Sequence, residues 1–149
     1  MPTIMRKVNM LSRCEGLYRT DHLRQEDLRG YHHSYILSIC GNPGISQEEL
    51  ARYICTNKST VTRHVTQLEE NGYVERRPSE SDRRVMRVYP TERMQALLPA
   101  VRRITEEWDR YLTEGLSEAE IAGFYRILER ITERATHYLE EREKAEQCE

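Results

Sequence analysis

This chain of 149 residues lacks the features that mark most enzymes, metal proteins and membrane proteins. No apolar run is long enough to span a bilayer, and the first residues contain no apolar signal-peptide region. The four cysteines form no C-x-x-C pair, and the histidines form no metal-spaced cluster beyond the adjacent His32 and His33. The sequence contains no phosphate loop, nucleophile–base pattern or acid pair in a pocket-like context. We therefore expect a cytoplasmic protein that is not an enzyme, has no metal or cofactor and contacts no membrane.

The segment 45–54, ISQEELARYI, predicts a short helix with a clear start. Ser46 can act as the N-cap, and Glu49 can bond back to the backbone N–H of the cap, which completes a capping box. An apolar stripe follows, formed by Leu50, Ala51 and Ile54. The helix ends in a tight connection, in which Thr56 or Asn57 can cap the next helix.

Residues 57–71 predict a second helix with two different faces. The apolar face, at 100° per residue, consists of Val61, Val65 and Leu68. The opposite face carries small or hydrogen-bonding side chains, namely Ser59, Thr60, Arg63, Thr66 and Gln67. Such a face suits the major groove of DNA, because bulky side chains would hold the helix away from the base edges. Glu69 and Glu70 would repel phosphate, so we expect the amino-terminal half to be inserted, although a polar helix face alone is more often simply solvated.

Residues 73–90 predict a strand, a polar turn and a second strand. Five arginines crowd this short hairpin, namely Arg76, Arg77, Arg83, Arg84 and Arg87. Asp82 is placed to hold the guanidinium of Arg84 through a charge-assisted hydrogen bond, and a narrow minor groove attracts arginine. By itself the hairpin is equally consistent with a basic surface turn. Directly after a helix-turn-helix, it favours a wing that contacts DNA.

These segments together resemble the MarR family of bacterial transcriptional regulators. The matching residues are ISQEELA, STVTRHVTQLEENGYVERR, Asp82-Arg83-Arg84 and Thr91-Glu92, which together span about a third of the chain. One departure follows the wing, where members often have Leu-Thr-Glu-x-Gly. Here Pro90 precedes Thr91, and Met94 stands where glycine is common.

The resemblance implies a homodimer that binds a pseudo-palindromic operator in double-stranded DNA. It usually implies a repressor, which often releases DNA when a small molecule or an oxidant acts. It also implies that Arg84 reaches the minor groove and that the major-groove helix carries Ser59, Thr60, Arg63 and His64. Combined with the residue pattern, the predicted DNA contacts are Lys58, Ser59, Thr60, Arg63, His64, Gln67, Arg77, Asp82, Arg83 and Arg84.

The whole chain predicts a mainly α fold with a small β-wing, about six helices and one β-hairpin in a single domain. We expect a winged helix-turn-helix DNA-binding region over 31–90, flanked by helical dimerisation regions over 1–30 and 91–149. The flanking helices are predicted at about 3–24, 91–113 and 117–143, and a further helix at 31–40. A second capping box, from Ser117 and Glu120, is predicted to start the last helix.

The last helix carries an apolar stripe over five turns, formed by Ile121, Phe124, Leu128, Ile131, Ala135 and Tyr138. This surface exceeds what a small winged helix can cover, so we expect an intertwined dimer with a twofold axis. The alternative is that these helices pack on their own domain. Residues 106–149 contain 13 acidic and 6 basic residues, so this end should face away from a duplex.

Little in the sequence identifies an effector. The resemblance places effectors between the dimerisation helices and the winged region, where the candidates are Tyr18, His32, Tyr35, Trp108 and Tyr111. Ordinary core aromatics are the alternative for each. Cys14 is the candidate for a redox-sensing thiol, whereas Cys40 and Cys55 are expected to be small core residues. Two other functions stay open, a thiol-based redox regulator of the same fold and a winged-helix module that binds protein and no DNA.

Overall fold

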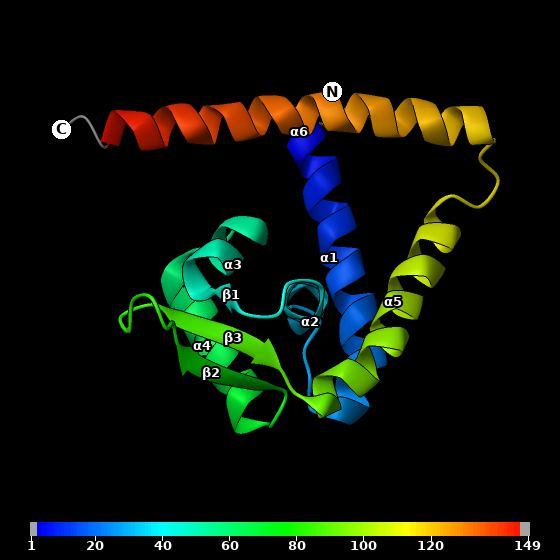
Figure 1. The fold of residues 1–149 in the computed structure, drawn as a ribbon. Helices are drawn as coiled ribbons and strands as arrows, with labels where there is room; N and C mark the ends of the chain where they lie inside the picture. The colour runs from blue at the N-terminus through cyan, green and yellow to red at the C-terminus, as the bar shows by residue number, and fades with distance from the viewer. Residues whose placement is uncertain (1–2, 147–149) are drawn as a thin grey trace. The chain divides into compact units, whose positions relative to one another are not determined.

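The structure, a computed structural model, describes residues 3–146 (Figure 1). The elements are α1 (Ile4–Leu23), η1 (Arg24–Glu26), α2 (His32–Gly41), β1 (Ile45–Ser46), α3 (Gln47–Tyr53), α4 (Lys58–Glu70), β2 (Val74–Pro78), β3 (Met86–Pro90), α5 (Glu92–Leu112) and α6 (Glu118–Glu146). They form two compact units, Met1–Trp108 and Asp109–Glu149. The predicted fold class, mainly α with a small β-wing, is confirmed.

Two helices begin at the capping boxes that the sequence predicts. At the start of α3, the Glu49 backbone N–H donates to Ser46 Oγ at 3.1 Å, and the Ser46 backbone N–H donates to Glu49 Oε2 at 2.8 Å. Before α6, the same reciprocal pair joins Ser117 and Glu120, with distances of 2.8 and 3.3 Å. Each cap satisfies N–H groups of the first turn that have no partner within the helix.

The sheet has three strands in the order β1-β3-β2, and both pairs are antiparallel. The predicted hairpin is the β2–β3 pair, whereas the two-residue strand β1 was not expected. A strand this short has no alternating pattern that could reveal it. It pairs Ile45 with Val88, and so joins the base of the wing to the start of α3. Gly44 permits this approach, because its φ is +85° and a side chain there would meet the Tyr89 ring at 3.1 Å.

The core of the first unit is built from the apolar sides of α2, α3, α4, the sheet and α5. Its fully buried members include Ile36, Ile39, Leu50, Val61, Val65, Leu68, Val88 and Val101. Met94 is also fully buried, which accounts for an apolar residue where the family often has glycine. Thr91 starts α5 by accepting a hydrogen bond from the Met94 backbone N–H at 3.4 Å. Burying each large aliphatic side chain contributes about 1.5–3 kcal/mol, so this core holds α4 and the β2–β3 hairpin in place.

Cys55 lies outside the core, so the expectation that it packs there is wrong. Its φ of +53° places it in the left-handed region directly after α3. The backbone N–H of Thr56 donates to the Ala51 carbonyl at 2.9 Å, which closes the end of the helix. This left-handed closure turns the Cys55 side chain toward solvent.

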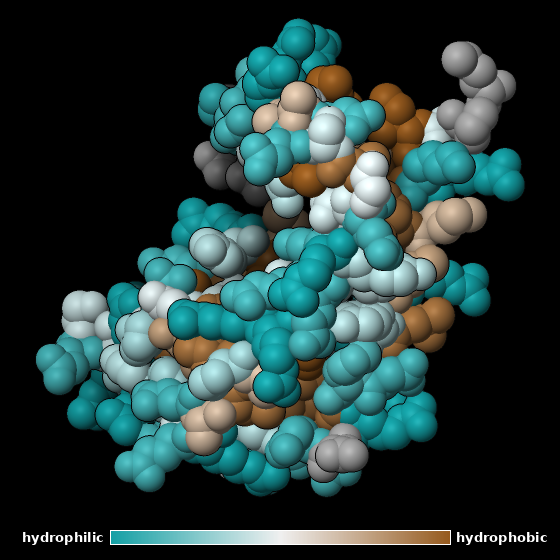
Figure 2. Space-filling model, turned by 90° about the vertical axis from the view of Figure 1, so that its right-hand side faces the viewer, coloured by the Kyte–Doolittle hydropathy of each residue, from teal (hydrophilic) through white to brown (hydrophobic). Residues whose placement is uncertain are grey.

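The second unit contains the end of α5 and the whole of α6. In α6 the apolar side chains are exposed, including Phe124 (55%), Ile127 (58%), Leu128 (38%) and Ile131 (39%). The first half of α1, in the other unit, also exposes apolar side chains, namely Ile4, Met5, Val8, Met10 and Leu11. Figure 2 shows such hydrophobic side chains open to solvent among hydrophilic ones. Among the described residues, no helix combines the length and hydropathy needed to cross a membrane.

Candidate nucleic-acid interface

The helices α3 and α4 form the helix-turn-helix, and hydrogen bonds from two directions fix the start of α4. Asn57, one of the two caps that the sequence allows, accepts hydrogen bonds from the Thr60 backbone N–H at 2.8 Å and from Ser59 Oγ at 2.7 Å. Gln47 at the start of α3 donates through Nε2 to Thr62 Oγ1 at 3.0 Å. These contacts fix the position of the amino-terminal half of α4, which we expect to enter a groove of DNA.

The outward surface of α4 has the composition that the sequence predicts. Lys58, Ser59 and Arg63 are exposed, whereas Thr60 and Gln67 are half-buried; we call these five residues the α4 surface. Lys58 Nζ lies 3.0 Å from Glu48 Oε1, but both side chains are largely exposed. A solvated ion pair of this kind is weak, so the Lys58 ammonium can exchange its carboxylate partner for a phosphate.

His64 departs from the expectation that it faces DNA, because its side chain is only 9% exposed. Its Nδ1 lies 3.1 Å from the Tyr35 hydroxyl, and its ring stacks on Tyr31 with centroids 4.1 Å apart. Burial, and then the nearby Arg63 cation, lower the pKa of His64. The ring therefore serves packing between α2 and α4 rather than the outward surface.

The tip of the wing presents an arginine held in a defined orientation. Arg84 donates through Nε to Asp82 Oδ1 at 3.1 Å, and the Arg84 backbone N–H donates to the same oxygen at 3.0 Å. This pairing confirms the predicted contact, and it lowers the pKa of Asp82. The Arg84 side chain is nevertheless 91% exposed. Arg83 beside it is also exposed, so the tip carries two cations open to an anionic partner.

The other three wing arginines bond to groups of the protein away from the wing tip, a distinction that the sequence pattern did not reveal. Arg76 donates to Glu69 at the end of α4 at 2.6 and 2.9 Å and fastens the wing to that helix. Arg87 donates to the Gly44 carbonyl at 2.9 Å. Arg77 donates to Glu75 at 2.6 Å. Of these three, Arg77 is the most exposed, with 63% of its side chain in solvent, which is compatible with its predicted DNA contact.

The candidate effector residues fall into separate groups. Tyr18 of α1 stacks on Trp108 of α5, with ring centroids 4.9 Å apart. His32 and Tyr35 of α2 are buried beside His64 instead. Tyr111 belongs to the second unit and is 67% exposed. The tertiary structure thus brings Tyr18 and Trp108 together from distant parts of the chain.

The adjacent histidines of α2 are both buried but face different neighbours. The backbone N–H of Arg29 donates to His32 Nδ1 at 3.0 Å. His33 Nε2 lies 2.9 Å from Thr105 Oγ1 and 3.2 Å from the Val101 carbonyl. Burial is the main cause that lowers the pKa of each ring to about 4. Within residues 3–146, no three His, Cys, Asp or Glu side chains are grouped to hold a metal.

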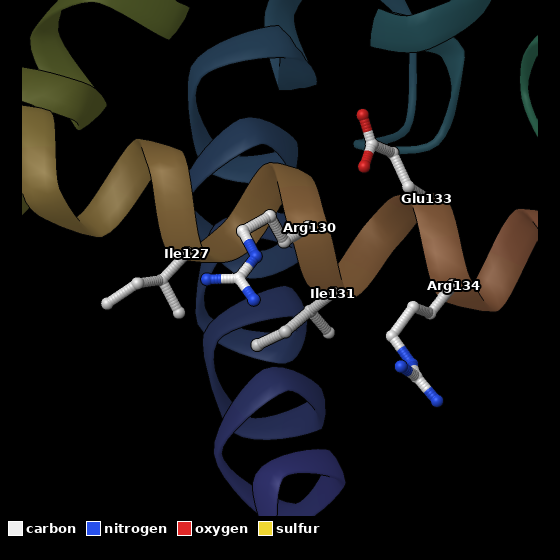
Figure 3. Close-up of a pocket in the computed structure, with 5 residues that line it drawn as sticks. All are labelled: Ile127, Arg130, Ile131, Glu133 and Arg134. Carbon is white, nitrogen blue, oxygen red and sulfur yellow. The ribbon is translucent and has the colours of Figure 1, made fainter.

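A shallow hollow of about 460 Å³ lies along α6 (Figure 3). Its lining residues all come from this helix, namely Ile127, Arg130, Ile131, Glu133 and Arg134. Ile127 and Ile131 lie side by side, whereas Glu133 points away from them. A hollow lined by one helix is an open face rather than an enclosed ligand site.

The thiols are spread over the chain. Cys14 of α1 is exposed. Cys40 is half-buried against the core, as predicted, and burial raises the pKa of its thiol. Cys148 lies outside the described residues.

A core-anchored helix-turn-helix, a basic outward helix surface and an arginine-tipped β-hairpin define a winged helix-turn-helix protein. Residues 32–86 match the model of the MarR family. This region is therefore a MarR-family domain, and the chain as a whole is similar to MarR-family transcriptional regulators.

The chain is similar in sequence and structure to known relatives over nearly its whole length. An uncharacterised HTH-type transcriptional regulator of Bacillus subtilis, YybA, is 28% identical over 131 residues, 88% of this chain and 87% of that protein. The crystal structure of the transcriptional regulator SlyA is 27% identical, with a TM-score of 0.88 over 91% of this chain and 96% of that one. A MarR-family regulator from Listeria monocytogenes, crystallised with 26mer DNA, is 26% identical, with a TM-score of 0.84 over 90% and 89% of the chains.

Proposed function

We propose that this protein is a sequence-specific repressor that binds a pseudo-palindromic operator as a homodimer. The α4 surface enters the major groove, and Arg83 and Arg84 of the wing tip lie in the adjacent minor groove. The observation that carries this proposal is the state of Arg84, which is oriented by Asp82 yet almost fully exposed. An arginine held in this way has lost part of its side-chain freedom before binding, which favours insertion into a groove of negative potential.

The homodimer is proposed from the apolar side chains that α1 and α6 leave in solvent. Side chains such as Ile4 and Val8 on α1, and Phe124 and Ile131 on α6, are exposed in the single chain. A contiguous apolar surface in water is stabilised when a second copy covers it. A twofold dimer built from residues 1–30 and 91–149 would set two copies of α4 about 34 Å apart, one turn of DNA.

The DNA-bound relative from Listeria supports this arrangement, because its chain superimposes on most of this one. The location follows from the function, and we propose the cytoplasm, where a bacterial operator is accessible. A small effector is proposed to release the DNA, with the stacked pair Tyr18 and Trp108 as its first candidate contact. An aromatic pair between α1 and α5 offers ring surface to a flat ligand.

The direct test is a gel-shift assay of the full chain against fragments of its own genome, followed by footprinting. We expect salt-dependent binding to a few fragments and a footprint with two halves centred about one helical turn apart. A protein-interaction module of the same fold would bind none of the fragments selectively, and that result would overturn the proposal.

A further inference from the structure

Tyr31 directly precedes α2, outside the helix-turn-helix, yet it touches α4 at two points. Its hydroxyl donates a hydrogen bond to Gln67 Oε1 at 3.2 Å. Its ring stacks on His64, with centroids 4.1 Å apart and planes 18° from parallel. His64 and Gln67 lie three residues apart on one helix and are therefore neighbours on its surface. Tyr31 therefore contacts two neighbouring side chains on the turn of α4 that carries Gln67.

The Tyr31 ring packs on a cluster of side chains, which we call the platform, formed by His64, Tyr35 and His32. His64 is buried beneath it and is fixed by the contact of its Nδ1 with the Tyr35 hydroxyl at 3.1 Å. His32 closes the cluster, with its ring centroid 5.9 Å from that of His64. Tyr31 itself is 43% exposed, so its hydroxyl edge lies at the border between this platform and the solvent.

The hydrogen bond from Tyr31 distinguishes the two ends of the Gln67 carboxamide. The oxygen accepts from the tyrosine, and this bond holds the carboxamide in one orientation.

This orientation has a consequence for base reading. Glutamine recognises adenine with both ends of its carboxamide, by accepting from N6 and donating to N7. The oxygen keeps a second lone pair beside the bond from Tyr31, so a carboxamide fixed in this way offers one defined arrangement of donor and acceptor to a base edge.

We propose that Tyr31 is a positioning residue for DNA recognition, which holds the Gln67 carboxamide in one orientation and so fixes the base preference at one base pair. This inference rests on the proposed function, because it needs α4 in the major groove.

The test compares the wild type with Tyr31→Phe in selection from a randomised duplex library. Phenylalanine keeps the ring on His64 and removes the hydroxyl alone, so folding is preserved, which circular dichroism verifies. We expect the preference at one base pair per half-site to weaken by about fivefold or more, the discrimination of one good base contact. The salt dependence of binding should be unchanged, because no phosphate contact is lost.

Two further variants separate positioning from a structural role. Gln67→Ala should lose the preference at the same base pair, and adding Tyr31→Phe to it should change nothing more. Tyr53→Phe, which removes a hydroxyl from an exposed tyrosine of α3, serves as the matched control and should select like the wild type. A Tyr31→Phe protein that binds all sequences equally more weakly, with its base preferences intact, would overturn the role of Tyr31 but leave the proposed function standing. If the wild type selects no sequence, the proposed function itself fails, and this inference fails with it.

Discussion

The core of the first unit and α6 differ in how they place their apolar side chains. In the first unit, Ile36, Leu50 and Val65 are fully buried, whereas Phe124 and Ile127 of α6 are more than half exposed. A helix gains most of its stability from packing an apolar face, and α6 packs none of its large apolar residues fully in the single chain. The winged unit therefore contains what it needs to fold, while α6 depends on a surface that we assign to a second copy.

The side chains exposed on the wing tip and those exposed on α6 differ in how they interact with water. On the wing tip, the exposed group is the Arg84 guanidinium, which is well hydrated and ready for an anionic partner. On α6, the exposed groups are hydrocarbon, which water does not stabilise. Four predictions test whether each exposed or buried group has the role that this comparison gives it.

The largest effect is expected from Leu128→Glu, which places a charge in the apolar stripe of α6. If this stripe is the dimer contact, burying the carboxylate is too costly, and the protein should become monomeric. Losing the second half-site contact should weaken operator binding by about a hundredfold or more. Analytical ultracentrifugation and gel shifts measure the two effects. The control, Arg126→Glu, puts the same side chain on the opposite side of α6, and a Leu128→Glu protein that stayed dimeric would show that this stripe is not the contact.

A second prediction concerns the buried histidines of the first unit. Both His32 and His33 have pKa values of about 4, below the ordinary value of 6.5, so the unfolded chain takes up protons first as the pH falls. The free energy of unfolding should therefore decrease between pH 6.5 and about 4, on the order of 2 kcal/mol for each ring, with no further loss from them below that range. Urea unfolding at about pH 7 and about pH 5 measures it.

The matched pair for this experiment is His33→Gln and His137→Gln. His33 is fully buried, whereas the His137 side chain is 66% exposed on α6. His33→Gln should flatten the pH dependence of unfolding, and His137→Gln should leave it as in the wild type. Equal slopes for all three proteins would contradict a special role for the buried ring.

A third prediction separates two arginines of the wing. Arg84→Ala should lower the affinity for every operator by about tenfold and reduce the salt dependence by about one unit, without changing sequence preference. Arg76→Ala should instead lower thermal stability, because Arg76 joins the wing to Glu69. Fluorescence anisotropy and thermal unfolding record the two outcomes. An Arg84→Ala protein that binds and footprints like the wild type would remove the wing from the proposed interface.

The smallest effect is expected from Asp82→Asn. The amide keeps the shape of the carboxylate but weakens the charge-assisted bond that orients Arg84. We expect operator affinity to fall by about threefold, through lost orientation of a guanidinium that is still present. When Arg84→Ala is already in place, Asp82→Asn should have almost no effect, and an additive loss would indicate that Asp82 acts on its own.

Much of the fold follows from signals between near neighbours in the sequence. The capping boxes at Ser46 and Ser117, the apolar spacing of α4 and the hairpin turn each involve residues within a few positions of one another, so the order of residues alone reveals them. The pairing of Asp82 with Arg84 was predictable for the same reason. Strand β1 was not predictable, because its existence depends on β3, which lies about forty residues later in the sequence.

The sequence alone did not distinguish the five arginines of the wing, and the resemblance to the MarR family placed His64 among the DNA contacts. Arg76 donates a hydrogen bond to Glu69, and His64 contacts Tyr31 and Tyr35, whereas the Arg84 side chain remains exposed to solvent. These differences arise from contacts with other elements, and no local pattern encodes them.

The amino-acid sequence alone determined the helices, their caps, the hairpin and the family, because these depend on periodicity and short-range bonding. The tertiary structure alone decided which cations stay exposed, which imidazoles are buried and how the Gln67 carboxamide is oriented. Those outcomes depend on residues such as Tyr31 and Gln67, 36 positions apart, whose contact exists only once the core has brought α2 and α4 together.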